Sequence, residues 1–266
     1  MSDIAFERVT IPTSAGSACM SVALRRQPFN PRRPLLVFLH GLVQPVSSFL
    51  PAVDQFLTTL EDGSDELDLL LYDRFGAGQS DKDPRQGVHT LPLVVEDLRN
   101  LLRHCLGSEE EVDPTPMIFV VHSIGGAIVR YYAQQYPSAS IEGILFLDPM
   151  IASTDFVSIY QPRDGEQPSQ EELDELKQAR EISRRIFHPS LPNAEGFDRS
   201  TVASLLPRDD EPKLASKTRQ PCVIVVAHDR NVNVRDMERK LGMPQRATRN
   251  YLEPRWEQVS MRSSGG

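Results

Sequence analysis

The stretch VVHSIGGAIV, residues 120–129, joins an apolar run to an amphipathic segment. The run Met117–Val121 has no polar residue, as is typical of a strand buried on both faces. Ala127–Gln135 has the apolar spacing of a helix, and Ser123 stands between the two segments, followed closely by two glycines. The stretch therefore predicts a serine on a sharp turn from a buried strand into a helix.

Other segments repeat this alternation of strand and helix along the chain. Strands that alternate with helices imply a parallel sheet wrapped on both faces, with the functional residues at the carboxyl ends of the strands. The sequence thus predicts the α/β class, with a mostly parallel, doubly wound sheet. The supporting segments are a hairpin (6–11 and 18–24), strands (35–39, 69–72, 144–147 and 223–226) and helices (49–60, and 94–105 with Thr90 as its cap).

The alternation stops between Met150 and Pro221. Ser169 and Glu172 form the pattern of a capping box that opens a charged helix. Its apolar stripe fits either packing on the domain or a lid over a pocket, and a long insertion after a strand favours the lid. We therefore expect a first core part (1–149), a lid or cap insertion (150–220) and a last core part (221–266). The stripe consists of Leu173, Leu176, Ala179, Ile182 and Ile186.

Composition narrows the class of function. The formal net charge of −8 argues against nucleic-acid binding, and no apolar run approaches the roughly 18 residues that span a bilayer. The N-terminus lacks the basic and apolar regions of a secretory signal. Cys19, Cys105 and Cys222 are too widely spaced for a disulfide framework or a metal site, so we expect buried, reduced thiols. These features predict a cytoplasmic protein with no nucleic-acid partner and no membrane partner; they leave the oligomeric state open.

A serine hydroxyl becomes a nucleophile only when a base removes its proton and donors stabilise the resulting oxyanion. The turn at Ser123 would aim backbone amides of the following helix at a reacting carbonyl. LLVFLHG (35–41) ends another strand and places the N–H of Leu42 beside that of Ile124 as a second donor. In YDRFGAGQSD (72–81) the glycines fit a tight loop, and Asp73 and Arg74 are interpreted as residues that hold it together.

These segments, with GILFLDP (143–149), resemble the α/β-hydrolase fold family in order and spacing. The likeness covers nearly all of residues 4–150 and resumes at PCVIVVAHD (221–229); LDPMIASTDFVSIY (147–160) and YLEPRW (251–256) resemble a fungal branch often met among secondary-metabolism genes. The resemblance implies a serine hydrolase without cofactor or metal, acting on an ester, thioester or lactone of a small apolar metabolite. A serine at the turn argues against epoxide hydrolase or haloalkane dehalogenase chemistry.

The resemblance also implies roles for single residues. Ser123 would be the nucleophile, and the N–H groups of Leu42 and Ile124 would form the oxyanion hole. The acid would be either Asp148 or Asp229, which each follow a strand. Both have a structural alternative, because Asp148 precedes a proline as turn-formers do and Asp229 fits the cap of a helix. Val121 departs from the family motif, which has a glycine at that position.

The base is the main departure from the family. In the family, the catalytic residues follow one another along the chain in the order nucleophile, acid, histidine. In this sequence no histidine follows His228, and the tail has no clear apolar strand. His122 adjoins Ser123 but should point to the opposite face of the strand, so His228 is the remaining substitute. Three explanations stay open: a hydrolase that is truncated or mis-spliced at its C-terminus, a weak or substrate-assisted enzyme, or a catalytically impaired protein that binds a ligand or partner.

Overall fold

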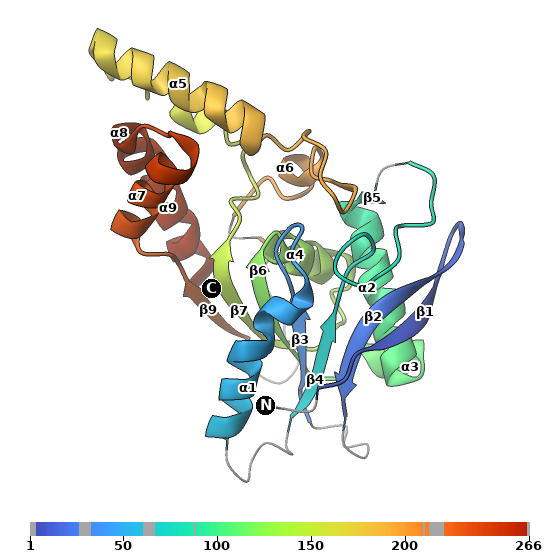
Figure 1. Cartoon of the computed structure of the whole chain (residues 1–266). Coiled ribbons are helices and arrows are strands. Elements are labelled where there is room, and N and C mark those ends of the chain that lie inside the picture. Colours follow the sequence, from blue (N-terminus) through green and yellow to red (C-terminus); the bar gives the residue numbers. More distant parts are fainter. Residues whose placement is uncertain are drawn as a thin grey trace.

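A computed structural model describes residues 4–26, 33–60, 67–87, 89–209, 211–212 and 221–264, with only the backbone for 259–264. Within these residues the main sheet has seven strands in the order β1-β2-β4-β3-β6-β7-β9 (Figure 1). The first two pairings are antiparallel and the others are parallel. This confirms the predicted α/β class. The strands are β1 (Glu7–Thr13), β2 (Gly16–Arg25), β3 (Leu35–Leu39), β4 (Asp68–Tyr72), β6 (Met117–Ser123), β7 (Ile141–Pro149) and β9 (Cys222–Val226).

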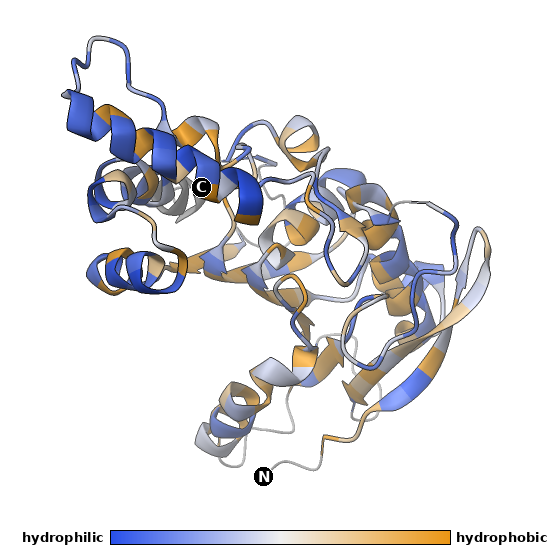
Figure 2. Ribbon diagram, turned by 45° about the horizontal axis from the view of Figure 1, so that its top comes forward, coloured by the Kyte–Doolittle hydropathy of each residue, from blue (hydrophilic) through white to orange (hydrophobic). Residues whose placement is uncertain are grey.

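Helices cover both faces of the sheet because the side chains of its strands alternate between two apolar layers. In β3, Leu35, Val37 and Leu39 join the cluster that includes α2 and α4, whereas Leu36 and Phe38 join the cluster that includes α1. Figure 2 shows the strands as mainly hydrophobic ribbon between these layers. The elements of these layers are η1 (Val46–Phe49), α1 (Leu50–Thr59), α2 (Leu91–Leu106), α3 (Glu109–Val112) and α4 (Gly125–Gln135).

A third apolar cluster joins the segment after β7 to the C-terminal helices, and Figure 1 shows α5 beside these helices. α5 (Gln170–Ile186) opens with the predicted capping box of Ser169 and Glu172, and it buries the middle of its stripe there. The ends of the stripe, Leu173 and Ile186, are exposed. The elements after β7 are η3 (Ser158–Tyr160), α5, β8 (Phe197–Asp198), which pairs with β5 (His89–Thr90), α6 (Val202–Leu205), and then, after β9, α7 (Arg230–Leu241), α8 (Gln245–Ala247), η4 (Thr248–Leu252) and α9 (Glu253–Ser264).

The predicted ends of the three parts at residues 1, 220 and 266 lie outside the described residues. β9 forms one edge of the described sheet, so it is less buried than the sequence suggested. Ile224 and Val226 are 52% and 50% exposed. The thiol of Cys222 is also exposed, against the expectation of buried cysteines, because this residue starts the same edge strand.

Candidate active site

Ser123 occupies a sharp strand-to-helix turn, as the sequence predicts. It ends β6 with a φ of 51°, and α4 begins two residues later. Positive φ is uncommon outside glycine and marks strained positions that often serve a function. A Cβ at Gly125 would lie 2.5 Å from the carbonyl oxygen of Leu39, and one at Gly126 would lie 3.2 Å from the ring of Phe146. Glycine at both positions therefore allows the helix to start close against the sheet.

The loop after β3 carries the predicted second oxyanion donor. His40 is fully buried; its Nε2 lies 3.2 Å from the backbone N–H of Arg74, and its Nδ1 lies 2.8 Å from the carbonyl oxygen of Gly41. Since Nε2 accepts, we assign the proton to Nδ1, which donates to Gly41. Burial, and then the neighbouring Arg74 guanidinium, lower the pKa of His40 well below its usual value, so the ring is neutral. His40 therefore shapes this loop.

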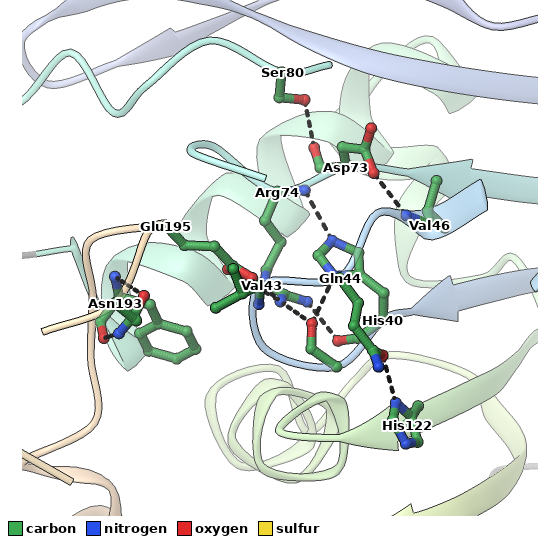
Figure 3. A network of polar contacts seen from close by, with 12 residues as sticks. His40, Val43, Gln44, Val46, Asp73, Arg74, Ser80, His122, Asn193 and Glu195 are labelled. Carbon is green, nitrogen blue, oxygen red and sulfur yellow. Dashed lines mark hydrogen bonds and ion pairs between the residues drawn. The ribbon is translucent and has the colours of Figure 1, made fainter. Parts of the chain in front are cut away.

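Arg74 and Glu195 form a buried ion pair beside this loop (Figure 3). The guanidinium contacts both carboxylate oxygens, with Nε to Oε2 at 3.1 Å and Nη2 to Oε1 at 3.0 Å. It also donates to the carbonyl oxygens of His40 and Gly41, at 2.7 and 2.9 Å. Asp73 accepts the N–H groups of Val46 and Gln79. Asp73 and Arg74 thus hold the loops together, which confirms their interpretation from the sequence.

His122 faces the same loop. Its Nδ1 lies 2.9 Å from Oε1 of Gln44, and a Cβ at Gly41 would lie 2.6 Å from that nitrogen (Figure 3). Burial lowers the pKa of His122, and the carboxylate of Asp148 acts in the opposite direction. His122 therefore links the strand that carries Ser123 to the loop after β3.

His228 lies at the end of β9 between two carboxylates. Its Nδ1 is 2.7 Å from Oδ1 of Asp148, and its Nε2 is 3.3 Å from Oε2 of Glu253, the first residue of α9. The ring also meets Trp256 edge-to-face, with centroids 4.9 Å apart. Hydrogen bonds to Asp148 and then Glu253 raise the pKa of His228 to about 9. The ring is therefore an imidazolium at neutral pH.

The two candidate acids have different surroundings. Asp148 is skipped in the pairing of β6 with β7, where Ser123 stands opposite Pro149, and it has a φ of 45°. This bulge puts its carboxylate next to His228. The carboxylate of Asp229 accepts the N–H of Val232 and caps α7. The structure thus brings Asp148 and His228 together and places Asp229 at a helix cap.

Replacing Asp148 by asparagine is expected to move the pKa of His228 from about 9 toward 6.5, because the charged partner that raises it most is lost. The measurement is an NMR titration of the His228 ring, assigned with a His228→Gln variant. Asp229→Asn is the matched control and should leave the titration in place, since Asp229 bonds to its own helix. A larger shift in the control would instead assign the acid role to Asp229.

Ser123, Leu42 and Ile124 lie where the sequence places them, at the ends of β6 and β3. Within the described residues, Ser123 has no hydrogen bond to His228, and the N–H groups of Leu42 and Ile124 have no acceptor. The part of the chain that the structure describes contains no group of three or more His, Cys, Asp or Glu side chains that could hold a metal ion. None of its helices has the length and hydropathy needed to cross a membrane.

Glu195, Glu253 and Trp256 are site residues that sequence reasoning missed. Glu195 lies in an irregular stretch before β8, and Glu253 and Trp256 lie in YLEPRW (251–256), a stretch that resembles a branch of the family but has no predicted site role. No catalytic motif distinguishes the two glutamates from ordinary surface carboxylates, although both are buried in the structure. Only the spacing of Glu253 and Trp256 on one helix face places them together once α9 is known.

Known proteins similar to this chain include one sequence family and several solved structures. The model of the alpha/beta hydrolase family matches residues 36–261. Among curated proteins, none matches the sequence. Similar solved structures include a protein from Pseudomonas aeruginosa PAO1 (13% identity, TM-score 0.49, covering 94% of this chain and 84% of that chain) and epoxide hydrolases from metagenomes of hot environments (17%, 0.47, 94% and 88%). For a protein from Agrobacterium vitis S4 the identity is 20% and the TM-score 0.44; the match covers 66% of this chain and spans 62% of that protein.

Proposed function

Because the chain belongs to the alpha/beta hydrolase family, we propose that it is a serine hydrolase that cleaves an ester, thioester or lactone bond of a small apolar metabolite. The observation that carries the proposal is the strained turn at Ser123, with φ at 51° and two glycines packed against the sheet. The proposal keeps the cytoplasmic location and the role in secondary metabolism that the sequence suggests.

In the proposed reaction, Oγ of Ser123 attacks the substrate carbonyl carbon. The carbonyl oxygen becomes an oxyanion that accepts the N–H groups of Leu42 and Ile124. His228 takes the hydroxyl proton and later gives it to the leaving group, while Asp148 stabilises the imidazolium. Water then attacks the acyl-enzyme, which releases the acid and restores the serine.

This reaction requires His228 to turn toward Ser123. The strands β6 and β9 are separated by β7, so the two backbones are about 9.5 Å apart at two strand spacings. Nδ1 is held by Asp148, as in a catalytic triad, and Nε2 is the nitrogen left for the serine. Nε2 must therefore leave Glu253 and lose the proton that it carries in the imidazolium before it can accept the proton of Ser123.

Replacing Ser123 by alanine is expected to abolish covalent labelling by a fluorophosphonate probe, because the probe reacts with an activated serine oxygen. The measurement is labelling followed by mass spectrometry of the peptide that contains residue 123. Ser153→Ala, which removes an ordinary serine that bonds to Asp209, is the control and should label like wild type. Equal labelling of wild type and Ser123→Ala would refute the proposed activity.

A second candidate function is a catalytically impaired protein that binds a ligand or partner. The observation that favours it is that both ring nitrogens of His228 contact carboxylates, because an imidazolium between two carboxylates is a poor base. Turnover of a p-nitrophenyl ester separates the two functions. Turnover that disappears in Ser123→Ala supports the hydrolase, and absence of turnover from pH 6 to 10 supports the binding protein.

A further inference from the structure

The peptide between Gly41 and Leu42 has a fixed orientation. In a planar trans peptide, the carbonyl oxygen and the N–H point in opposite directions. The carbonyl oxygen of Gly41 accepts Arg74 Nη2 at 2.9 Å and faces Nδ1 of His40 at 2.8 Å. The N–H of Leu42 is therefore directed away from Arg74, and no described residue accepts it. This is the orientation that an oxyanion donor needs.

Arg74 is in turn oriented by Glu195. Only 2% of the Arg74 side chain and 1% of the Glu195 side chain are exposed, so no solvent competes for their charges. The carboxylate takes Nε and Nη2 of the guanidinium, which leaves Nη1 aimed at the carbonyl oxygen of His40 at 2.7 Å. A planar guanidinium held on two sides has little freedom to rotate. Glu195 thus fixes the guanidinium whose Nη1 and Nη2 hold the carbonyl oxygens of His40 and Gly41.

Glu195 also acts on the next residue of the loop. Its Oε1 accepts the backbone N–H of Val43 (Figure 3). Val43 has a φ of 61°, a conformation that a β-branched side chain rarely adopts. A strained residue persists only where its surroundings hold it. The contact with Glu195 supplies that restraint one residue beyond the oxyanion donor.

We propose that Glu195 is a positioning residue for the oxyanion hole, acting through Arg74 on the Gly41–Leu42 peptide. The proposal rests on the proposed hydrolase function. Glu195 comes from the segment between β7 and β9, so that segment does more than cover the sheet. The segment completes the loop that would stabilise the oxyanion. A shift of the segment relative to this loop would therefore change the direction of the Leu42 N–H.

The test replaces the ion pair by apolar side chains in an Arg74→Met/Glu195→Leu double variant, because buried ion pairs often tolerate such an exchange. Arg99→Met is the matched control: Arg99 is also buried and ion-paired, but its partners are Glu109 in α3 and Asp113 directly after it. Thermal unfolding establishes that each variant folds. Glu195→Gln, which keeps the size of the side chain but removes the charge that holds both Arg74 and the Val43 N–H, is used if the double variant does not fold.

Two readouts separate positioning from mere support of the fold. In the double variant we expect the rate of fluorophosphonate labelling and kcat for a p-nitrophenyl ester to fall about 100-fold, with KM within twofold of wild type. This is the usual effect of losing an oxyanion donor. The Glu195→Gln variant should lose about tenfold. Hydrogen exchange of the Val43 amide should become faster in both, and Arg99→Met should change neither readout.

Each outcome decides the proposal. Labelling and kcat within threefold of wild type in the folded double variant would overturn it. Wild type that labels no better than Ser123→Ala would refute the hydrolase function itself, and hydrogen exchange then decides the positioning role. If the Val43 amide exchanges its hydrogen as slowly in the variants as in wild type, the positioning role is overturned. Faster exchange in the variants supports it.

Discussion

Replacing Gly76 by alanine is expected to lower the free energy of unfolding by about 3 kcal/mol. The added Cβ would lie 2.3 Å from the backbone carbonyl oxygen of Glu195, which cannot rotate away as a side chain can. Gly76 also has a φ of +81°, so an L side chain is strained there whatever the space. Both effects act at the point where the loop after β4 meets the segment that carries Glu195.

Gly242→Ala is the control for this prediction. Gly242 has a similar φ of +71° at the end of α7, but a Cβ there would meet no atom within 4 Å. Gly242→Ala should therefore lower the free energy of unfolding by about 1 kcal/mol, through backbone strain alone. Urea unfolding followed by circular dichroism gives both values. Equal losses in the two variants would mean that the close approach of Glu195 to Gly76 is wrong.

The order of strands and helices could be predicted because its signals are local. Five short apolar runs lie within β3, β4, β6, β7 and β9, and the capping box of α5 occurs where Ser169 and Glu172 place it. The turn at Ser123 was predictable for the same reason, since the serine and its glycines are neighbours in the chain. Periodicity and turn chemistry act over a few residues, and a sequence displays them directly.

The contacts that complete the site could not be predicted in this way. Arg74 and Glu195 are 121 residues apart, and Asp148 and His228 are 80 apart. Such pairs arise only when the sheet brings strand ends together, and an isolated glutamate carries no sign of its partner. The choice between the two acids had a local clue, because Asp229 stands before a helix whose N–H groups need a cap.

Raising the pH from 6 to 9.5 is expected to lower the free energy of unfolding by about 2 kcal/mol through His228 alone. Its folded pKa of about 9 lies above the ordinary value of 6.5, so its stabilising contribution is complete below pH 6.5 and is lost as pH rises through 9. The full difference corresponds to roughly 3 kcal/mol. Asp148 is 41% exposed, and screening by water reduces the expected effect. Urea unfolding at the two pH values measures it.

The same titration gives opposite trends for stability and reactivity if the chain is a hydrolase. Deprotonation loosens the contacts of His228 with Asp148 and Glu253, and it also creates the neutral imidazole that can accept the proton of Ser123. Labelling of Ser123 should therefore rise over the range in which stability falls. Glu253→Gln should shift both transitions to lower pH, since it removes one carboxylate, and His228→Gln should remove this part of the pH dependence. Stability that falls without any gain in labelling would favour the binding protein over the enzyme.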